Sequence, residues 1–422
     1  MITIDNRHKS HKAVDSLNYS AFYVKYLLFG FLCLCVGCIQ EFIPVGIAEE
    51  RGVLVIDGTI QDGESVFYLS YSMGISDSLD GSEFINNATV YVESNDGMRI
   101  TAILSGNGKY IAQTAVLDTL REYRLSATIN GRTCESEFLK PTISVEIDSV
   151  FPVKPTKLSP VEICVATHDP INRSNYYRWQ FRETWEVRTE LYANARYLED
   201  ENGKVIDWDR FILHNQFTSE NTYTCWGRDT SNTFLIASTE KLSENRITQQ
   251  TLITIPNTHD KLSRLYRIEV EQMQLREAAF RYFTDVKERS ERTGDIFSPV
   301  LTSGLRGNIY WCDNSEDLII GYIEVATVTT KDRYIWESEG LYIFPGFHCI
   351  PNMSDSECFG CFWWRHSLSN SNFDRSPPDA FYFAENPNNL HAHIKANRRC
   401  VDCRLKEKAT KLRPPGWPTN SL

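Results

Sequence analysis

Short segments in which apolar and polar residues alternate fill the chain from about residue 51 to residue 143. VLVIDGTI, VFYLSYS and NATVYVES show this two-residue period, which places every second side chain on one face of a β-strand. The tripeptide NDG after NATVYVES, and a later NG, supply turns of the kind that close β-hairpins. About seven short strands in one stretch are typical of a sandwich. The pattern therefore predicts an N-terminal immunoglobulin-like β-sandwich over residues 51–143.

Longer strand-like runs and one helical pattern follow in residues 144–345. YYRWQFRETWEVR, RLYRIEVEQM and DLIIGYIEVATVTT are rich in the β-branched and aromatic residues that favour strands. All nine tryptophans of the chain lie beyond residue 178. In residues 274–292 apolar side chains recur every three or four positions, as on one face of a helix: Leu275, Ala278, Ala279, Tyr282 and Val286. We expect a mainly β protein whose second domain is a larger, Trp-rich β-sandwich or barrel-like domain with one packed helix.

The last segment, residues 346–422, follows neither period and is rich in Asn, Ser and Pro, so we expect it to be irregular. It ends in the basic sequence KANRRCVDCRLKEKATKLR. Two interpretations of this sequence stay open. It is either a solvated tail or a docking strip for an acidic partner or anionic headgroups.

Near the start of the chain one apolar run, YLLFGFLCLCVGCI, covers only residues 26–39. A membrane-spanning helix needs about 20 apolar residues, whereas the apolar core of a signal peptide has about 7–15. The pair Gly37-Cys38 resembles a lipobox, although Cys35 stands where leucine is typical. We expect residues 1–37 to be a lipoprotein signal peptide, Cys38 to be acylated and held in membrane lipid, and residues 38–50 to be a tether. An uncleaved anchor and a buried core segment are the alternatives.

The overall charge argues against one class of partner. The chain carries 44 basic and 55 acidic residues, a formal net charge of -11. The phosphate backbone of DNA or RNA repels such a protein, so we expect no binding to nucleic acid.

The cysteines of the last segment could be joined by disulfides or could bind a metal ion. Outside the cytoplasm thiols are oxidised, so disulfides are the expected state there. The candidates are Cys349, Cys358, Cys361, Cys400 and Cys403. The alternative is a four-thiolate zinc site, because two CxxC pairs have the right local spacing. Its ligands would be Cys358, Cys361, Cys400 and Cys403.

Sequence motifs of hydrolytic enzymes are missing. The chain has no GxSxG, no HExxH and no Gly-rich phosphate loop that leads into a helix. We therefore expect no catalytic residues and no cofactor. Three consecutive aromatic residues, Phe362, Trp363 and Trp364, cannot all face inward on one strand, which makes them candidates for stacking on a ligand. Packing in a core is the alternative.

Several strings, taken in order, carry a resemblance to a known family. They are LVIDGTI, NATVYVESNDG, GKYIA, NGRTCESE, IDSVF, HDPINRSNYYRW, GNIYWCDNSEDLIIGYIEVATVTTKDRYI and a closing CVDC…RPPGW. In this order they resemble a Bacteroidota lipoprotein family catalogued as domain-of-unknown-function family 4249. The close departs slightly from the family, in which a Gly-Gly pair and KPxFW are common.

The resemblance implies a location and a kind of partner, but no chemistry. Members look like outer-membrane lipoproteins encoded beside TonB-dependent β-barrel receptors. By that association we expect a lipid-anchored, non-enzymatic accessory or ligand-binding protein of such a transporter, on the periplasmic or the surface face of the outer membrane. The alternative is a surface structural or adhesion lipoprotein that binds glycan or another cell-surface component. A hydrolase with an unrecognised site is a third possibility.

Overall fold

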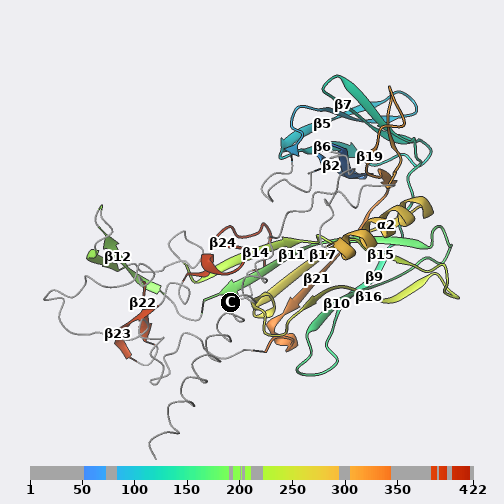
Figure 1. Cartoon of the computed structure of the whole chain (residues 1–422). Helices are drawn as coiled ribbons and strands as arrows, with labels where there is room; N and C mark the ends of the chain where they lie inside the picture. Colours follow the sequence, from blue (N-terminus) through green and yellow to red (C-terminus); the bar gives the residue numbers. More distant parts are fainter. Residues whose placement is uncertain are drawn as a thin grey trace, which may run out of the picture. The chain divides into compact units, whose positions relative to one another are not determined.

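The computed structural model describes residues 52–72, 83–189, 193–199, 201, 205–210, 222–293, 305–343, 382–386, 389–396 and 402–418. These residues are mainly β-strands, and one α-helix lies among them (Figure 1). No helix in the described part of the chain is both long and apolar enough to cross a membrane.

The first β-sandwich is a single curled sheet. Its strand order is β18-β8-β7-β4-β5-β6-β2-β1-β19, and β3 and β20 pair with β2 and β1 at its side. β5 makes the bend, because its first half pairs with β4 and its second half with β6. The eight strands from the N-terminal region are β1 Leu54–Gln61, β2 Gly63–Tyr71, β3 Glu83–Phe84, β4 Thr89–Ser94, β5 Arg99–Gly106, β6 Lys109–Ala115, β7 Tyr123–Ile129 and β8 Arg132–Ser136.

The alternation in the sequence accounts for the core of this sandwich. Val90 and Val92 on β4 lie opposite Ala127 and Leu125 on β7, and all four side chains are buried. Tyr91, between the two valines, is only half-buried and lies under the guanidinium of Arg99, as the two-residue period requires. This confirms the predicted sandwich.

Three strands from far along the chain complete the first sandwich. β18 pairs antiparallel with β8, whereas β19 and β20 pair parallel with β1. The two domains thus share residues 305–326 and do not divide at one point in the sequence. The bounds are β18 Ile309–Trp311, β19 Ile319–Ile320 and β20 Glu324–Ala326.

The second domain packs a six-stranded sheet on a three-stranded one. The larger sheet has the order β21-β17-β11-β14-β24, with β15 also on β11, and the smaller has the order β16-β10-β9. Tyr177 and Trp179 of β11 and Ile163 and Val165 of β10 belong to one buried core. The strands are β9 Ile147–Val153, β10 Val161–His168, β11 Tyr176–Arg188, β14 Thr224–Thr230, β15 Leu235–Ser238, β16 Arg246–Ile255, β17 Leu265–Leu275, β21 Thr329–Trp336 and β24 Ala409–Thr410.

The predicted helix is present as α2, Glu277–Thr293, and packs near β11 and β15 (Figure 1). Its buried stripe is Ala279, Tyr282, Phe283 and Val286, whereas Ala278 is exposed. Leu275, which we expected on the helix, ends strand β17 instead, because it pairs there with Tyr176.

Polar contacts hold the segment between the two sandwiches. Thr142 Oγ1 donates to the carbonyl of Gln274 at 2.7 Å, and the amide of Ser144 donates to Thr327 Oγ1 at 2.8 Å. Arg276 forms an ion pair with Glu324, whose side chain is fully buried. These contacts fix the start of α2 against the strands that complete the first sandwich.

Short elements also occur where an irregular tail was expected. Strands β22 Tyr382–Asn386 and β23 Asn389–Ala396 form a four-stranded sheet together with β12 Ala193–Glu199 and β13 Val205–Arg210. The single-turn helix η5 Cys403–Leu405 also lies in this last segment, whereas η1 Asp260–Leu262 and η3 Glu337–Glu339 lie earlier in the chain.

Candidate functional site

Most of the candidate residues from the sequence lie outside the described residues. This holds for the lipidation candidate Cys38 and for the aromatic residues Phe362, Trp363 and Trp364. It also holds for four of the five disulfide candidates, Cys349, Cys358, Cys361 and Cys400.

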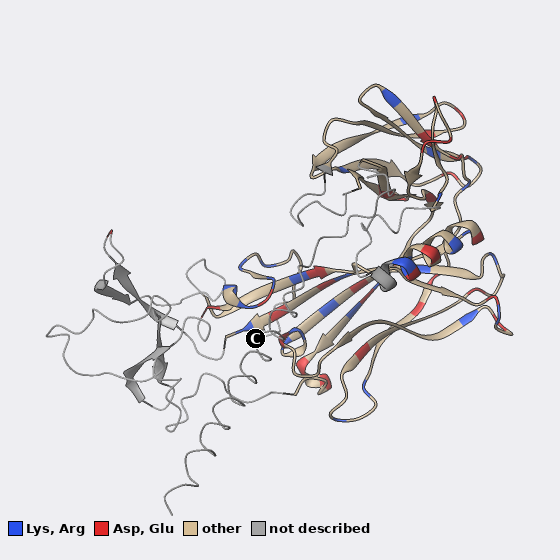
Figure 2. Ribbon diagram, viewed as in Figure 1, with Lys and Arg blue, Asp and Glu red and all other residues tan. Residues whose placement is uncertain are grey.

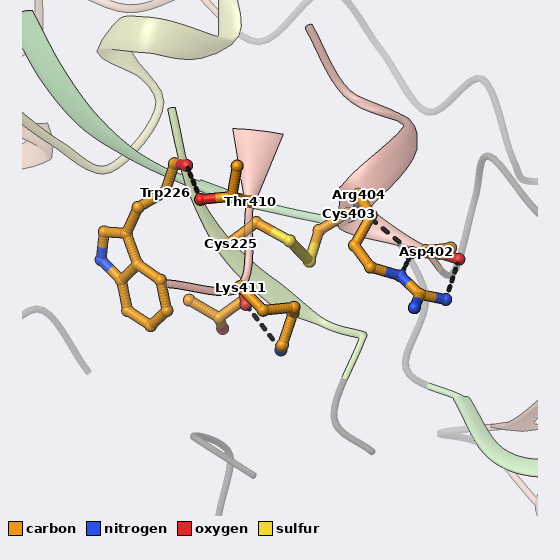
Figure 3. Close-up of a disulfide and its surroundings, with 8 residues drawn as sticks. Cys225, Trp226, Asp402, Cys403, Arg404, Thr410 and Lys411 are labelled. Carbon is orange, nitrogen blue, oxygen red and sulfur yellow. Dashed lines mark hydrogen bonds and ion pairs between the residues drawn. A yellow bond between two sulfur atoms is a disulfide. The ribbon is translucent and has the colours of Figure 1, made fainter. Parts of the chain in front are cut away.

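The fifth candidate, Cys403, forms a disulfide with Cys225 (Figure 3). The expectation that Cys403 pairs within the last segment is therefore corrected, since its partner lies 178 residues earlier on β14. The physical reason is that β24 pairs with β14, which places η5 beside that strand. Because its sulfur is bonded to Cys225, Cys403 does not fit the alternative four-thiolate zinc site. Within the described residues no three His, Cys, Asp or Glu side chains form a group that could hold a metal ion.

Basic residues around this disulfide bind the chain itself. Lys406 lies 2.9 Å from Asp260, and Lys408 lies 2.7 Å from Asp229. Lys411 donates to the carbonyl of Thr224 at 2.9 Å (Figure 3), and burial lowers its pKa to about 8. The described part of the basic tail thus docks onto the second domain of the same chain.

A buried charged cluster lies in the second domain. Glu183 accepts hydrogen bonds from Lys261 Nζ at 2.8 Å and from Tyr266 Oη at 2.7 Å. Lys261 also lies over the ring of Trp185, 4.6 Å from its centroid. Burial, together with the charge of Glu183, raises the pKa of Tyr266 well above its ordinary value. Both carboxylate oxygens have partners, so this cluster stabilises the core and presents no open group to a ligand.

The site with open polar groups is a cleft of about 770 Å³ between the first sandwich and the six-stranded sheet. Its volume lies within the ~300–1,000 Å³ typical of small-molecule sites. One wall consists of β1, β2 and β6, and the other consists mainly of β11, β17 and β21. The cleft is lined by Asp57, Gly58, Thr59, Gln61, Asp62, Glu64, Val66, Tyr68, Lys109, Arg178, Gln180, Phe181, Arg182, Thr230, Ser231, Glu271, Val328 and Thr330.

Strand periodicity decides which β11 residues reach the cleft. Tyr177 and Trp179 point into the core of the second domain and are fully buried. Arg178, Gln180 and Arg182 therefore point to the opposite face of the sheet, where the cleft lies. Figure 2 shows basic and acidic positions interspersed along the strands of this sheet.

Arg178 is the unusual member of the lining. Its side chain is only 5% exposed, and its Nη1 atom has no hydrogen-bond partner. The guanidinium carbon lies 4.6 Å from the ring centroid of Phe283 and 5.7 Å from that of Phe234. Burial lowers the pKa of Arg178, and the charges of Asp57 and Glu324 oppose that effect. The guanidinium stays charged, because arginine side chains are not deprotonated in proteins.

Arg182 and Asp62, two other charged groups of the cleft, already have partners. Arg182 forms ion pairs with Glu269 and, at 2.7 Å, with Glu271. On the opposite wall Asp62 accepts a hydrogen bond of 2.7 Å from the amide of Leu117. These contacts leave Arg178 as the buried cation of the cleft that lacks a hydrogen bond at one nitrogen.

Asp57 lies on the wall opposite Arg178 and is exposed. The next residue, Gly58, has room for no side chain, since a Cβ atom there would meet Cδ1 of Phe67 at 2.5 Å and the carbonyl of Val66 at 2.7 Å. β1 therefore packs close to β2 beside Asp57. Although the charge of Asp57 acts on Arg178, no ion pair joins the two among the described residues.

Sequence reasoning did not select Arg178 or Asp57. A signal was available in YYRW, where one arginine stands between aromatic residues of a strand that buries both faces. The IDGT sequence around Asp57 gave no comparable signal, because an Asp-Gly pair beside a strand is common at turns.

A protein-family model matches most of the chain. The family described as "Domain of unknown function (DUF4249)" matches residues 40–332, more than two thirds of the chain. No curated protein matches the chain.

Proposed function

Because the chain belongs to the DUF4249 family, we propose that it is a non-enzymatic ligand-binding lipoprotein of the cell envelope. It acts as an accessory subunit of a TonB-dependent outer-membrane transporter and holds a small polar ligand in the cleft between its two sandwiches. Cys38 carries the lipid anchor.

The observation that carries this proposal is the buried, incompletely bonded Arg178 at the edge of an open polar cleft. Taking a guanidinium out of water costs free energy unless hydrogen bonds replace the lost water. In the unbound protein this desolvation free energy is not fully offset. A ligand that supplies the missing hydrogen-bond acceptor offsets it, and this favours binding. Such a group is suited to recognition, whereas the carboxylate of Glu271 is already held in an ion pair with Arg182.

The anchor and the partner are supported by the sequence. The apolar run before Gly37-Cys38 has the length of a signal-peptide core. The resemblance to the family also implies an outer-membrane lipoprotein of a kind often encoded beside TonB-dependent receptors. A ligand-binding subunit held by lipid at the membrane increases the local concentration of the nutrient at the transporter.

The test is isolation of the native, full-length protein from outer membranes in mild detergent. We expect a large β-barrel transporter to co-purify, and we expect Cys38→Ser to remain unprocessed and to be lost from the complex. Isolation as a monomer would count against the proposal. If a deletion strain loses adhesion while its nutrient uptake stays intact, the surface-adhesion alternative is favoured instead.

A further inference from the structure

We propose that the cleft binds a short peptide with both termini free, whose carboxylate pairs with Arg178 and whose ammonium group pairs with Asp57. This inference rests on the proposed function, since it names the ligand class of the same cleft.

The carboxylate end follows from the state of Arg178. A guanidinium presents its N–H groups as a planar fork that matches the two oxygens of a carboxylate. In the structure Phe283 and Phe234 cover the guanidinium, and Nη1 has no acceptor. The rings fix the orientation of the side chain and exclude water from its faces, so an incoming carboxylate meets a preorganised donor.

The ammonium end follows from the position of Asp57. This carboxylate is on the opposite wall of the cleft and is exposed, so a cation can reach it. Its charge acts on Arg178 without an ion pair between the two among the described residues. Two opposite charges that face one cleft without touching are suited to a ligand that carries both signs.

The charge of the whole lining favours a zwitterion over a dianion such as phosphate. The basic lining residues are Lys109, Arg178 and Arg182, and the acidic ones are Asp57, Asp62, Glu64 and Glu271. With four carboxylates around it, a doubly negative ligand would be repelled, because like charges in a partly desolvated site interact strongly. A ligand with one charge of each sign avoids this repulsion.

The experiment measures binding to the full-length protein in detergent by calorimetry and thermal unfolding. The probes are a panel of dipeptides with free termini, the N-acetylated and C-amidated forms of the dipeptide that shifts the unfolding temperature most, and inorganic phosphate. We expect a free dipeptide to bind and either blocked form to bind at least tenfold more weakly.

Two variants assign the ends of the ligand. Arg178→Gln should weaken binding of the free dipeptide at least tenfold and leave binding of the amidated form unchanged. Asp57→Asn should also weaken binding of the free dipeptide at least tenfold, and it should leave binding of the acetylated form unchanged. Because Asp57 is exposed, this variant tests the inference even if the arginine variant fails to fold. The control is Arg99→Gln, since Arg99 also lies over an aromatic ring, 4.6 Å from the centroid of Tyr91, but is not part of the cleft.

Three outcomes would overturn the inference. They are no binding by any free dipeptide, equal binding of free and blocked forms, and binding of phosphate alone. The last of these would leave the cleft as a ligand site of another class and so would spare the proposed function. Loss of co-purification with a transporter would instead contradict the proposed function and leave the dipeptide result standing.

Discussion

The guanidinium of Arg178 on β11 lies against the ring of Phe283 on α2, 4.6 Å from the ring centroid. This contact joins the helix to the sheet at the point where the apolar core under α2 meets the polar cleft. It also shields a buried charge that lacks one of its hydrogen bonds.

Replacing Phe283 by Leu keeps most of the apolar volume but removes the cation–π contact. We expect a loss of about 1–3 kcal/mol in the free energy of unfolding, measured with urea. Phe280→Leu is the matched control, because Phe280 lies on the same helix as Phe283, stacks on Tyr176 of β11 and contacts no cation in the described structure. Equal losses for the two variants would show that the ring of Phe283 contributes packing alone.

Removing the Cys225–Cys403 disulfide should destabilise the second domain. Without it the unfolded chain gains entropy, and the expected loss is about 2–5 kcal/mol in the double variant Cys225→Ser/Cys403→Ser. The measurement is the urea midpoint, with Cys312→Ser as a control that removes an exposed free thiol. An unchanged midpoint in the double variant would show that the disulfide between β14 and the C-terminal segment does not stabilise the fold.

Asp169 gives the fold a pH-dependent contribution. Burial alone would raise its pKa, but hydrogen bonds from Gln274 Nε2 and from the amides of Arg173, Ile171 and Ser174 outweigh burial and lower it. Because the pKa of Asp169 is lowered in the folded state, its ionised carboxylate stabilises the protein at pH values above the ordinary carboxyl pKa of about 4. This stabilisation is lost as the pH falls below that value.

We therefore expect Asp169→Asn to lose about 1–3 kcal/mol of stability at pH 7. The difference from the wild type should shrink at pH 3, where the carboxyl of the wild type begins to take up a proton. Urea unfolding at the two pH values is the measurement. A difference that stays constant between them would show that the ionised form of Asp169 is not the stabilising one.

Removing only one partner of the Arg276–Glu324 ion pair should strongly lower the free energy of unfolding. Glu324 is fully buried, and burial raises its pKa while the charge of Arg276 lowers it. Arg276→Met leaves a buried carboxylate without its cation and should cost about 3–5 kcal/mol.

A carboxyl with a raised pKa in the folded state favours folding at low pH, and this contribution is lost as the pH rises. The Arg276→Met variant should therefore be less destabilised at pH 5 than at pH 8. The double variant Arg276→Met/Glu324→Leu should recover part of the loss, because it removes the unpaired charge. If the double variant is no better than the single one, the pair acts through packing and not through charge.

The three unpaired cysteines among the described residues should differ in reactivity. Cys134 and Cys164 are buried, whereas Cys312 is exposed. Burial raises the pKa of Cys134 to about 12, so its thiolate is scarce at neutral pH. In the native protein we expect a maleimide to modify Cys312 and to modify the other two only after unfolding, as read by peptide mass spectrometry. Modification of Cys134 at the rate of Cys312 would contradict the described packing of β8.

The sequence by itself predicted the kind of several elements that bury one face. The alternation in NATVYVES gave strand β4, and the three- and four-residue spacing around Tyr282 gave α2. These patterns are local, because a strand or helix repeats its buried face within a few residues. The same locality explains the error at Leu275, where a strand with buried side chains runs directly into the helix.

Only the tertiary structure decided which distant segments meet. The parallel pairing of β1 with β19 and β20, the partner of Cys403 and the facing positions of Asp57 and Arg178 all join parts far apart in the chain. No periodicity encodes these choices, since they depend on how complete sheets pack and on the entropy of closing long loops. The face that each strand buries was thus set locally, whereas the cleft forms only where strands from residues 57–109 meet strands from residues 178–330.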